Sequence, residues 1–194
     1  MEQLLAISPI DGRYYKYTKS LSKYFSEYSL FRYRLLIEIK YLVQLLDVLK
    51  IETKPEEIEL IKQIFDDYTP EKCLEIKKIE KQINHDVKAV EYYIKMELSK
   101  KKLHKFIRFV HFGLTSHDIN NTATPLSIKQ CIENDYTLLF KKITKELDIK
   151  SQAWKKIVMI TRTHGQPAVP STFGKEIKVF LYRLEKQYNI LNNT

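Results

Sequence analysis

The spacing of apolar residues is the feature that most restricts what this chain can fold into. Between residues 26 and 50, apolar side chains recur every three or four positions, at Phe31, Leu35, Ile39, Leu42, Leu46 and Leu49. A second such series near the end of the chain comprises Ile177, Phe180, Leu184, Tyr188 and Leu191. Spacings of three and four place each series on one stripe of a helix. In the first helix we expect an outer, solvated face formed by Arg32, Arg34, Glu38, Lys40 and Asp47.

Start signals predict the other helices. Pro55 stands where a missing N–H costs least, at the start of a helix over 55–67; further helices are expected over 70–82 and 86–100. Thr115 and Asp118 have the spacing of a capping box before a long helix from 118 to 150 or beyond, in which Pro125 predicts a kink or a later start. Residues 1–20 are predicted to be irregular.

The scarcity of glycine supports the same fold class. Only 4 of the 194 residues are Gly, so tight turns should be few and strands joined by hairpins are unlikely. The sequence therefore predicts an all-α protein with long bundle-type helices in its second half.

Composition also excludes several classes of protein. The two cysteines, Cys73 and Cys131, have neither metal-site spacing nor the density of a disulfide framework, and they suit a reducing compartment. The first residues show no signal peptide, and the longest apolar runs, of about four residues, are too short to cross a membrane. We therefore expect a cytoplasmic protein with no metal, no cofactor and no membrane partner.

The net charge of +9 raises the question of nucleic-acid binding. The lysines are interleaved with glutamates, as in 75–81, which is typical of a solvated helix face. We expect no nucleic-acid partner, and an anionic small molecule agrees equally well with the charge.

The segment Arg162–Ala168 predicts a functional site. It places His164 in a turn made irregular by Gly165 and Pro167, between two apolar segments. Asn, Asp or Ser is more usual in a surface turn. A histidine fixed there has an imidazole suited to acid–base chemistry near neutral pH.

Three further polar clusters each allow two interpretations. The first, 8–14, is either a plain turn or a turn whose Arg13 clamps a phosphate or carboxylate. The second, 84–92, is either a helix capped by Asn84 or an anion site with His85 and Lys88 at one helix end. In the third, the hydroxyls of Thr115 and Ser116 either cap a helix or bind a carboxylate.

Taken together, these motifs resemble the adenylosuccinate lyase family of the fumarase/aspartase superfamily. The resemblance rests on four segments in order along the chain: Ser8–Tyr14, Asn84–Tyr92, His111–Phe112 with Thr115–Ser116, and Arg162–Ala168. It implies a small N-terminal helical domain over 1–110 and the start of the central long-helix bundle over 111–194. It also implies a homotetramer in which each active site takes residues from three subunits.

The resemblance implies a β-elimination on small-molecule substrates. Relatives split adenylosuccinate into AMP and fumarate, and they split succinylaminoimidazole carboxamide ribotide in the same way. The family pattern makes His164 the acid that protonates the departing nitrogen. His85 would orient the leaving group, and nucleotide contacts would come from Arg13, Tyr14, Asn84, His85 and Asp86. Thr115 and Ser116 would receive a succinyl carboxylate.

The family's catalytic serine signature, Gly-Ser-Ser followed by Met-Pro-x-Lys and Asn-Pro, does not occur in these 194 residues. We therefore expect a truncated portion of a lyase that is inactive alone. The alternatives are another lyase of the superfamily, such as an argininosuccinate lyase, and a non-catalytic helical interaction protein.

Overall fold

A computed structural model describes residues 3–193 of the chain. Met1, Glu2 and Thr194, which the predicted domain ranges include, lie outside the described residues. The chain divides into two compact units, Met1–Cys131 and Ile132–Thr194. This division falls after the helix that begins at Ser116; the domain boundary expected at residue 110 stays a prediction. That helix packs against the first long helix and so belongs to the first unit.

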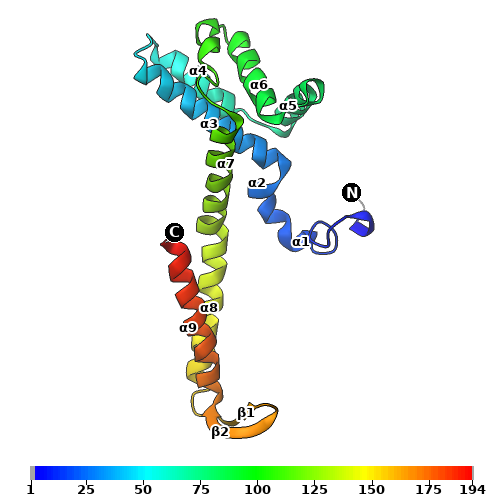
Figure 1. The fold of residues 1–194 in the computed structure, drawn as a ribbon, viewed down its shortest axis with the longest axis vertical. Helices are drawn as coiled ribbons and strands as arrows, with labels where there is room; N and C mark the ends of the chain where they lie inside the picture. Colours follow the sequence, from blue (N-terminus) through cyan, green and yellow to red (C-terminus); the bar gives the residue numbers. More distant parts are fainter. Residues whose placement is uncertain (1–2, 194) are drawn as a thin grey trace. The chain divides into compact units, whose positions relative to one another are not determined.

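The first unit is helical, with short 3-10 turns (Figure 1). Its elements are η1 Gln3–Leu5, α1 Tyr15–Thr18, η2 Lys19–Leu21, α2 Ser22–Phe25, α3 Glu27–Val48, α4 Pro55–Asp66, α5 Pro70–Ile83, α6 Asp86–Lys100, η3 His104–Phe109 and α7 Ser116–Cys131. The second unit contains the π-helical turn η4 Ile132–Tyr136, α8 Thr137–Ala153, strands β1 Val158–Thr163 and β2 Gln166–Thr172, and α9 Phe173–Asn192.

Local chemistry explains where the helices begin. Pro55 and Pro70 occupy the first positions of α4 and α5, where no N–H is needed. The Ser26 hydroxyl accepts a hydrogen bond from the Ser29 N–H at the start of α3. The Lys54 N–H donates to the Glu57 carboxylate at 2.9 Å before α4. The observed bounds confirm the helices predicted over 26–50, 55–67, 70–82 and 86–100.

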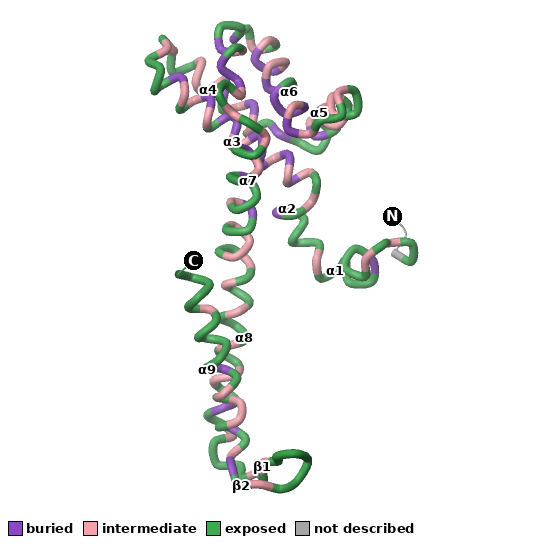
Figure 2. Tube along the Cα trace, viewed as in Figure 1, coloured by how far each residue is buried: buried purple, intermediate pink, exposed green. Residues whose placement is uncertain are grey.

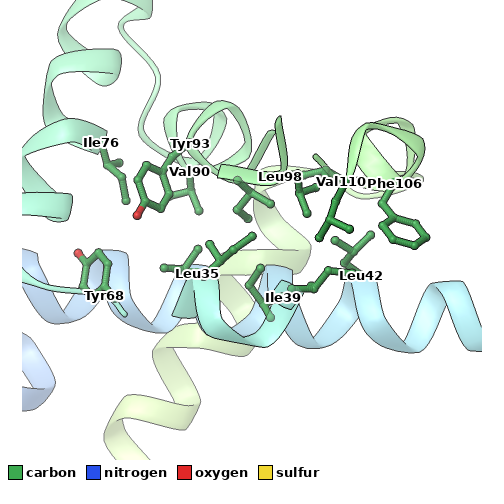
Figure 3. Close-up of a cluster of buried hydrophobic side chains, with 14 of the residues drawn as sticks. Leu35, Ile39, Leu42, Tyr68, Ile76, Val90, Tyr93, Leu98, Phe106 and Val110 are labelled. Atoms are coloured by element: carbon green, nitrogen blue, oxygen red, sulfur yellow. The ribbon is translucent and has the colours of Figure 1, made fainter. Parts of the chain in front are cut away.

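The core of the first unit lies between α3 and the helices α4, α5 and α6. Figure 3 shows Leu35, Ile39 and Leu42 of α3 facing Val90, Tyr93 and Leu98. All six side chains are at most 3% exposed. The predicted stripe of α3 is therefore confirmed, except that Leu49 caps the helix and is 44% exposed.

Two residues predicted on the outer face of α3 are buried instead. Arg34 is 5% exposed and Glu38 is 1% exposed. The physical reason is helical spacing: positions 34 and 38 follow Phe31 and Leu35 by three residues each and therefore fall within the apolar stripe. The prediction was right for Lys40 and Asp47, which are exposed.

In the second unit, α8 and α9 pack side by side (Figure 1). The Phe140 and Tyr188 rings stack with centroids 4.4 Å apart, and the Tyr188 hydroxyl lies 3.1 Å from that of Thr137. At the other end, a Cβ added to Gly174 would lie 2.2 Å from the Ser151 carbonyl oxygen. Gly174 therefore allows the two backbones to approach closely.

A β-hairpin between α8 and α9 departs from the prediction that hairpins are unlikely. Strands β1 and β2 pair antiparallel, with Thr163 opposite Gln166. His164 (φ 51°) and Gly165 (φ 77°) form the two-residue turn between them, and both have the positive φ of a type I′ turn. One glycine suffices because the histidine adopts the left-handed conformation. No other sheet occurs in residues 3–193, so the all-α class stands.

The residues predicted to form a long helix from 118 to 150 or beyond are helical: they form α7 in the first unit and η4 and α8 in the second. Pro125 lies inside α7 and does not delay its start. Within residues 3–193, no helix combines the length and the apolar composition that a membrane span requires.

We predict that Gly174→Ala destabilises the second unit by about 1–3 kcal/mol, because the new methyl group overlaps the α8 backbone. Chemical denaturation followed by circular dichroism measures the loss. Asn189→Ala, at an exposed position of the same helix, is the control and should change stability little. Equal stability of the two variants would contradict the close approach.

A second prediction concerns self-association. Much of the trace of α9 is coloured as exposed in Figure 2. Many large apolar side chains of the second unit are exposed, among them Leu138, Leu139, Ile143, Phe180, Tyr182 and Ile190. Patches of this kind mark association surfaces. Light scattering should show oligomers of the chain that weaken in the double variant Leu139→Gln/Ile143→Gln. The control is Leu74→Gln, an equally exposed leucine of the first unit; a monomeric wild-type chain would contradict the prediction.

Candidate functional site

The start of α6 carries three of the residues predicted to contact a nucleotide. Asn84 was predicted to cap this helix, but it ends α5 instead, in a left-handed conformation (φ 54°, ψ 38°). Asparagine tolerates this conformation better than most residues, so the chain can leave one helix and begin the next within two residues. His85 then takes the extended position before α6 and caps it.

The cap fixes the hydrogen-bonding state of the His85 imidazole. Its Nδ1 accepts a hydrogen bond from the Lys88 N–H at 3.1 Å. The neutral ring must therefore carry its proton on Nε2. Nε2 lies 3.5 Å from the Ser116 hydroxyl oxygen at the start of α7. His85 thus presents a hydrogen-bond donor beside Ser116, where two helix starts meet.

Asp86, the next residue, is held by a buried arginine of α3. Its Oδ2 lies 2.7 Å from Arg34 Nη2, and its Oδ1 accepts from the Val87 N–H at 2.8 Å. Arg34 also donates from Nε to the Asn120 side-chain oxygen in α7, at 2.9 Å. Burial opposes ionisation of Asp86, but the Val87 N–H and the Arg34 guanidinium outweigh it and lower the pKa of this carboxyl group.

Thr115 and Ser116 differ in how they can meet a ligand. The Thr115 N–H and hydroxyl both donate to Asp118 Oδ2, at 2.6 and 2.9 Å. These two bonds lower the pKa of Asp118. The bond from the Thr115 N–H is one half of the predicted capping box; the Asp118 N–H donates to the Thr115 carbonyl oxygen and not to the hydroxyl. Both bonds to Asp118 occupy donors that a succinyl carboxylate was expected to use. The Ser116 hydroxyl faces His85 instead.

A second buried pair lies one helical turn further along α3. Glu38 Oε1 and His111 Nδ1 are 2.5 Å apart, and the Glu38 side chain is fully buried. Burial raises the pKa of Glu38, and the contact with His111 opposes that rise. On α6, the buried Glu91 pairs with Lys88 at 2.8 Å and with Lys95 at 2.6 Å. The ammonium group of Lys88, which was expected to bind an anionic ligand, is thus paired with Glu91 of the same helix.

Sequence reasoning gave no role to Arg34, Glu38 or Glu91, although Glu91 lies in the recognised segment 84–92. The signal was present, since each charged residue stands at a position that helical spacing assigns to an apolar stripe. His111 was recognised as part of a motif but was given no role. Its partner Glu38 is 73 residues away in the sequence, so no local pattern could identify the pair.

The structure does not bring every predicted site residue to this cluster. Arg13 lies over the Tyr14 ring, 4.8 Å from its centroid, just before α1. The predicted turn there is confirmed by hydrogen bonds from the Asp11 and Gly12 N–H groups to the Ser8 carbonyl oxygen. Within the described residues, no hydrogen bond or ion pair joins Arg13 or Tyr14 to the cluster around His85.

His164 belongs to the second unit, at the tip of the β-hairpin. Its side chain is exposed, and among the described residues no hydrogen bond restrains its imidazole. The turn places the imidazole at the surface of the hairpin, and the acid–base role of His164 stays a prediction. Across residues 3–193, no group of three or more His, Cys, Asp or Glu side chains is arranged to hold a metal ion.

Comparisons with known proteins agree with the motifs. Residues 12–194 match the sequence profile of a family described as lyase. The chain is 44% identical to an adenylosuccinate lyase of Dictyostelium discoideum, across all of this chain and 43% of that protein. It is 43% identical to an adenylosuccinate lyase of Buchnera aphidicola subsp. Schizaphis graminum, across 98% of this chain and 43% of that one. The chain thus spans less than half the length of these relatives.

The fold has counterparts among solved structures. A fumarate lyase from Mesorhizobium sp. BNC1 superposes with a TM-score of 0.74 over 90% of this chain and 39% of that one, at 20% sequence identity. At this identity the likeness shows the fold alone.

The Asp86 interactions predict how stability depends on pH. Because folding lowers the pKa of Asp86 below 3.8, its ionised form stabilises the folded chain above about pH 4, and this contribution disappears as pH falls through the lower, folded pKa. Asp86→Asn should therefore reduce the free energy of unfolding at neutral pH, and the difference from wild type should shrink below pH 4. Denaturation over a pH series measures it. Asp47→Asn, at an exposed position of α3, is the control; a pH-independent difference for Asp86→Asn would contradict the assignment.

Proposed function

The chain belongs to the lyase family whose profile covers residues 12–194, and on this basis we propose that it is the N-terminal portion of an adenylosuccinate lyase. The observation that carries the proposal is the meeting of His85 and Ser116, 3.5 Å apart at the starts of α6 and α7. Two helix starts at one point favour an anionic ligand. The similarity to adenylosuccinate lyases supports the choice of substrate.

The proposed reaction is the elimination of fumarate from adenylosuccinate, leaving AMP. A base removes a proton from the succinyl carbon next to a carboxylate, the electron pair of that bond forms the C=C bond, and the C–N bond breaks. His164 gives its proton to the departing nitrogen. Succinylaminoimidazole carboxamide ribotide would be split in the same way. Near neutral pH an imidazole can carry that proton and give it up within one turnover.

The other residues would bind and orient the substrate. The Nε2–H of His85 is a donor for the nucleotide portion, while the Ser116 hydroxyl and the α7 start receive a succinyl carboxylate. Thr115 would also bind the succinyl carboxylate once its N–H and hydroxyl are released from the Asp118 carboxylate. Arg13, Tyr14, Asn84 and Asp86 are proposed nucleotide contacts, with the Arg13 fork suited to a phosphate.

We propose that the catalytic base and the rest of the helical bundle come from outside these 194 residues. The base would be a serine on a loop that the complete lyase supplies. We propose that the complete enzyme is a cytoplasmic homotetramer whose bundle covers the exposed apolar side chains of α8 and α9, so the chain alone should lack activity.

The test is an assay for fumarate release from adenylosuccinate, followed by ultraviolet absorbance. We expect no release by the chain alone and release after the C-terminal portion of a related adenylosuccinate lyase is added. Argininosuccinate serves as the comparison substrate. Release from argininosuccinate only would indicate a different lyase, and no release from either substrate would favour a non-catalytic role.

In the reconstituted enzyme, His164→Asn should lower kcat by about 10²–10⁴-fold, because the acid is lost while asparagine still permits positive φ in the turn. His85→Ala should raise KM about tenfold or more, since a hydrogen bond to a charged ligand is worth about 1.5–3 kcal/mol. His104→Ala, at an exposed histidine of η3, is the control for both. Unchanged kinetics in the His164 variant would remove that residue from the mechanism.

A further inference from the structure

Arg34 contacts both helices that carry the residues of the proposed site. It projects from α3 and binds Asp86 at the start of α6 and Asn120 in the second turn of α7. Asp86 adjoins His85, and Asn120 lies four residues after Ser116. The guanidinium therefore connects the two segments whose side chains meet at 3.5 Å.

The geometry of these bonds sets a spacing. Nε and Nη2 lie on the same edge of the planar guanidinium, and their N–H bonds form a rigid fork. One prong binds Asn120 Oδ1 at 2.9 Å and the other Asp86 Oδ2 at 2.7 Å. The two oxygens, one on α6 and one on α7, are therefore held by adjacent N–H groups of a single rigid side chain.

The surroundings of Arg34 keep this fork in place. The residue is 5% exposed, and its guanidinium carbon lies 5.6 Å from the centroid of the Phe31 ring. On the opposite edge, Nη1 makes no hydrogen bond within the described residues. The orientation of the guanidinium is therefore fixed by the edge that binds Asp86 and Asn120.

We propose that Arg34 is a positioning residue that sets the distance between His85 and Ser116 by bridging Asp86 and Asn120. The expected effect of Arg34 on catalysis rests on the proposed function. The bridge itself is a property of the chain without ligand. Charge alone does not suffice for this role: a lysine ammonium has no planar fork and a shorter reach, so it cannot span both oxygens in the same way.

The first test needs no substrate. In a chain labelled at histidine and serine, nuclear Overhauser contacts between the His85 ring protons and the Ser116 Hβ protons report the juxtaposition. We expect these contacts in wild type and their loss in both Arg34→Met and Arg34→Lys. The control is Arg32→Met, which removes a charge two residues earlier from a side chain that lies over Phe65. Contacts retained in Arg34→Met, or restored fully in Arg34→Lys, would overturn the proposal.

A variant that does not fold leaves the proposal testable. Circular dichroism identifies such a variant. Asn120→Ala then decides the question, because it removes the hydrogen bond from Arg34 Nε and keeps the Arg34–Asp86 pair. We expect weaker His85–Ser116 contacts in Asn120→Ala, and full retention there would count against the bridge.

The second test uses the reconstituted enzyme. Arg34→Met should lower kcat/KM about tenfold or more, chiefly through KM, and Ser116→Ala should then cost much less in the Arg34→Met background than in wild type. Equal costs in both backgrounds would show that Arg34 does not act through Ser116. An inactive reconstituted wild type would refute the proposed function and leave the ligand-free result to decide the role of Arg34.

Discussion

The burial of charge on α3 and α6 is the constraint on which the first unit depends. An ionised side chain taken out of water is tolerated only when paired and hydrogen-bonded. Arg34 meets this condition through Asp86 and Asn120, Glu38 through His111, and Glu91 through Lys88 and Lys95. Most of these partners lie near the start of α6 or α7. When the apolar stripe of α3 packs into the core, its buried charged residues therefore bring those segments into place. The cluster around His85 is thus a consequence of how the buried charges are paired.

Much of the fold was predictable because its signals are local. Pro55 indicated the start of α4, and the three- and four-residue spacing of apolar side chains predicted α3 to within two residues at each end. The hairpin was not predicted because glycine content is an average over the chain. A single turn needs only two residues with positive φ, and one of them is a histidine. The π-helical turn at Ile132–Tyr136 has no signature in the apolar pattern, so the end of the first unit could not be placed there.

The candidate site was predictable in its residues and less so in its contacts. The motifs identified His85, Asp86, Thr115 and Ser116. The cap of α6 was displaced by one residue, because Asn84 serves equally well at the end of one helix as at the start of the next. Asp118 accepts from the Thr115 donors, a contact that the spacing of these two residues had indicated. The pairing of Arg34 with Asp86 and Asn120 depends on tertiary packing, so neighbouring sequence positions do not encode it.

The capping bond of His85 links the fold of one helix to the chemistry of one side chain. The ring accepts the Lys88 N–H through Nδ1, so in the neutral ring the proton lies on Nε2, the atom that faces the Ser116 hydroxyl. The backbone of the first turn of α6 therefore decides which imidazole nitrogen is the hydrogen-bond donor. A substitution that displaces the Lys88 N–H would alter the hydrogen-bonding character of His85 without changing the histidine itself.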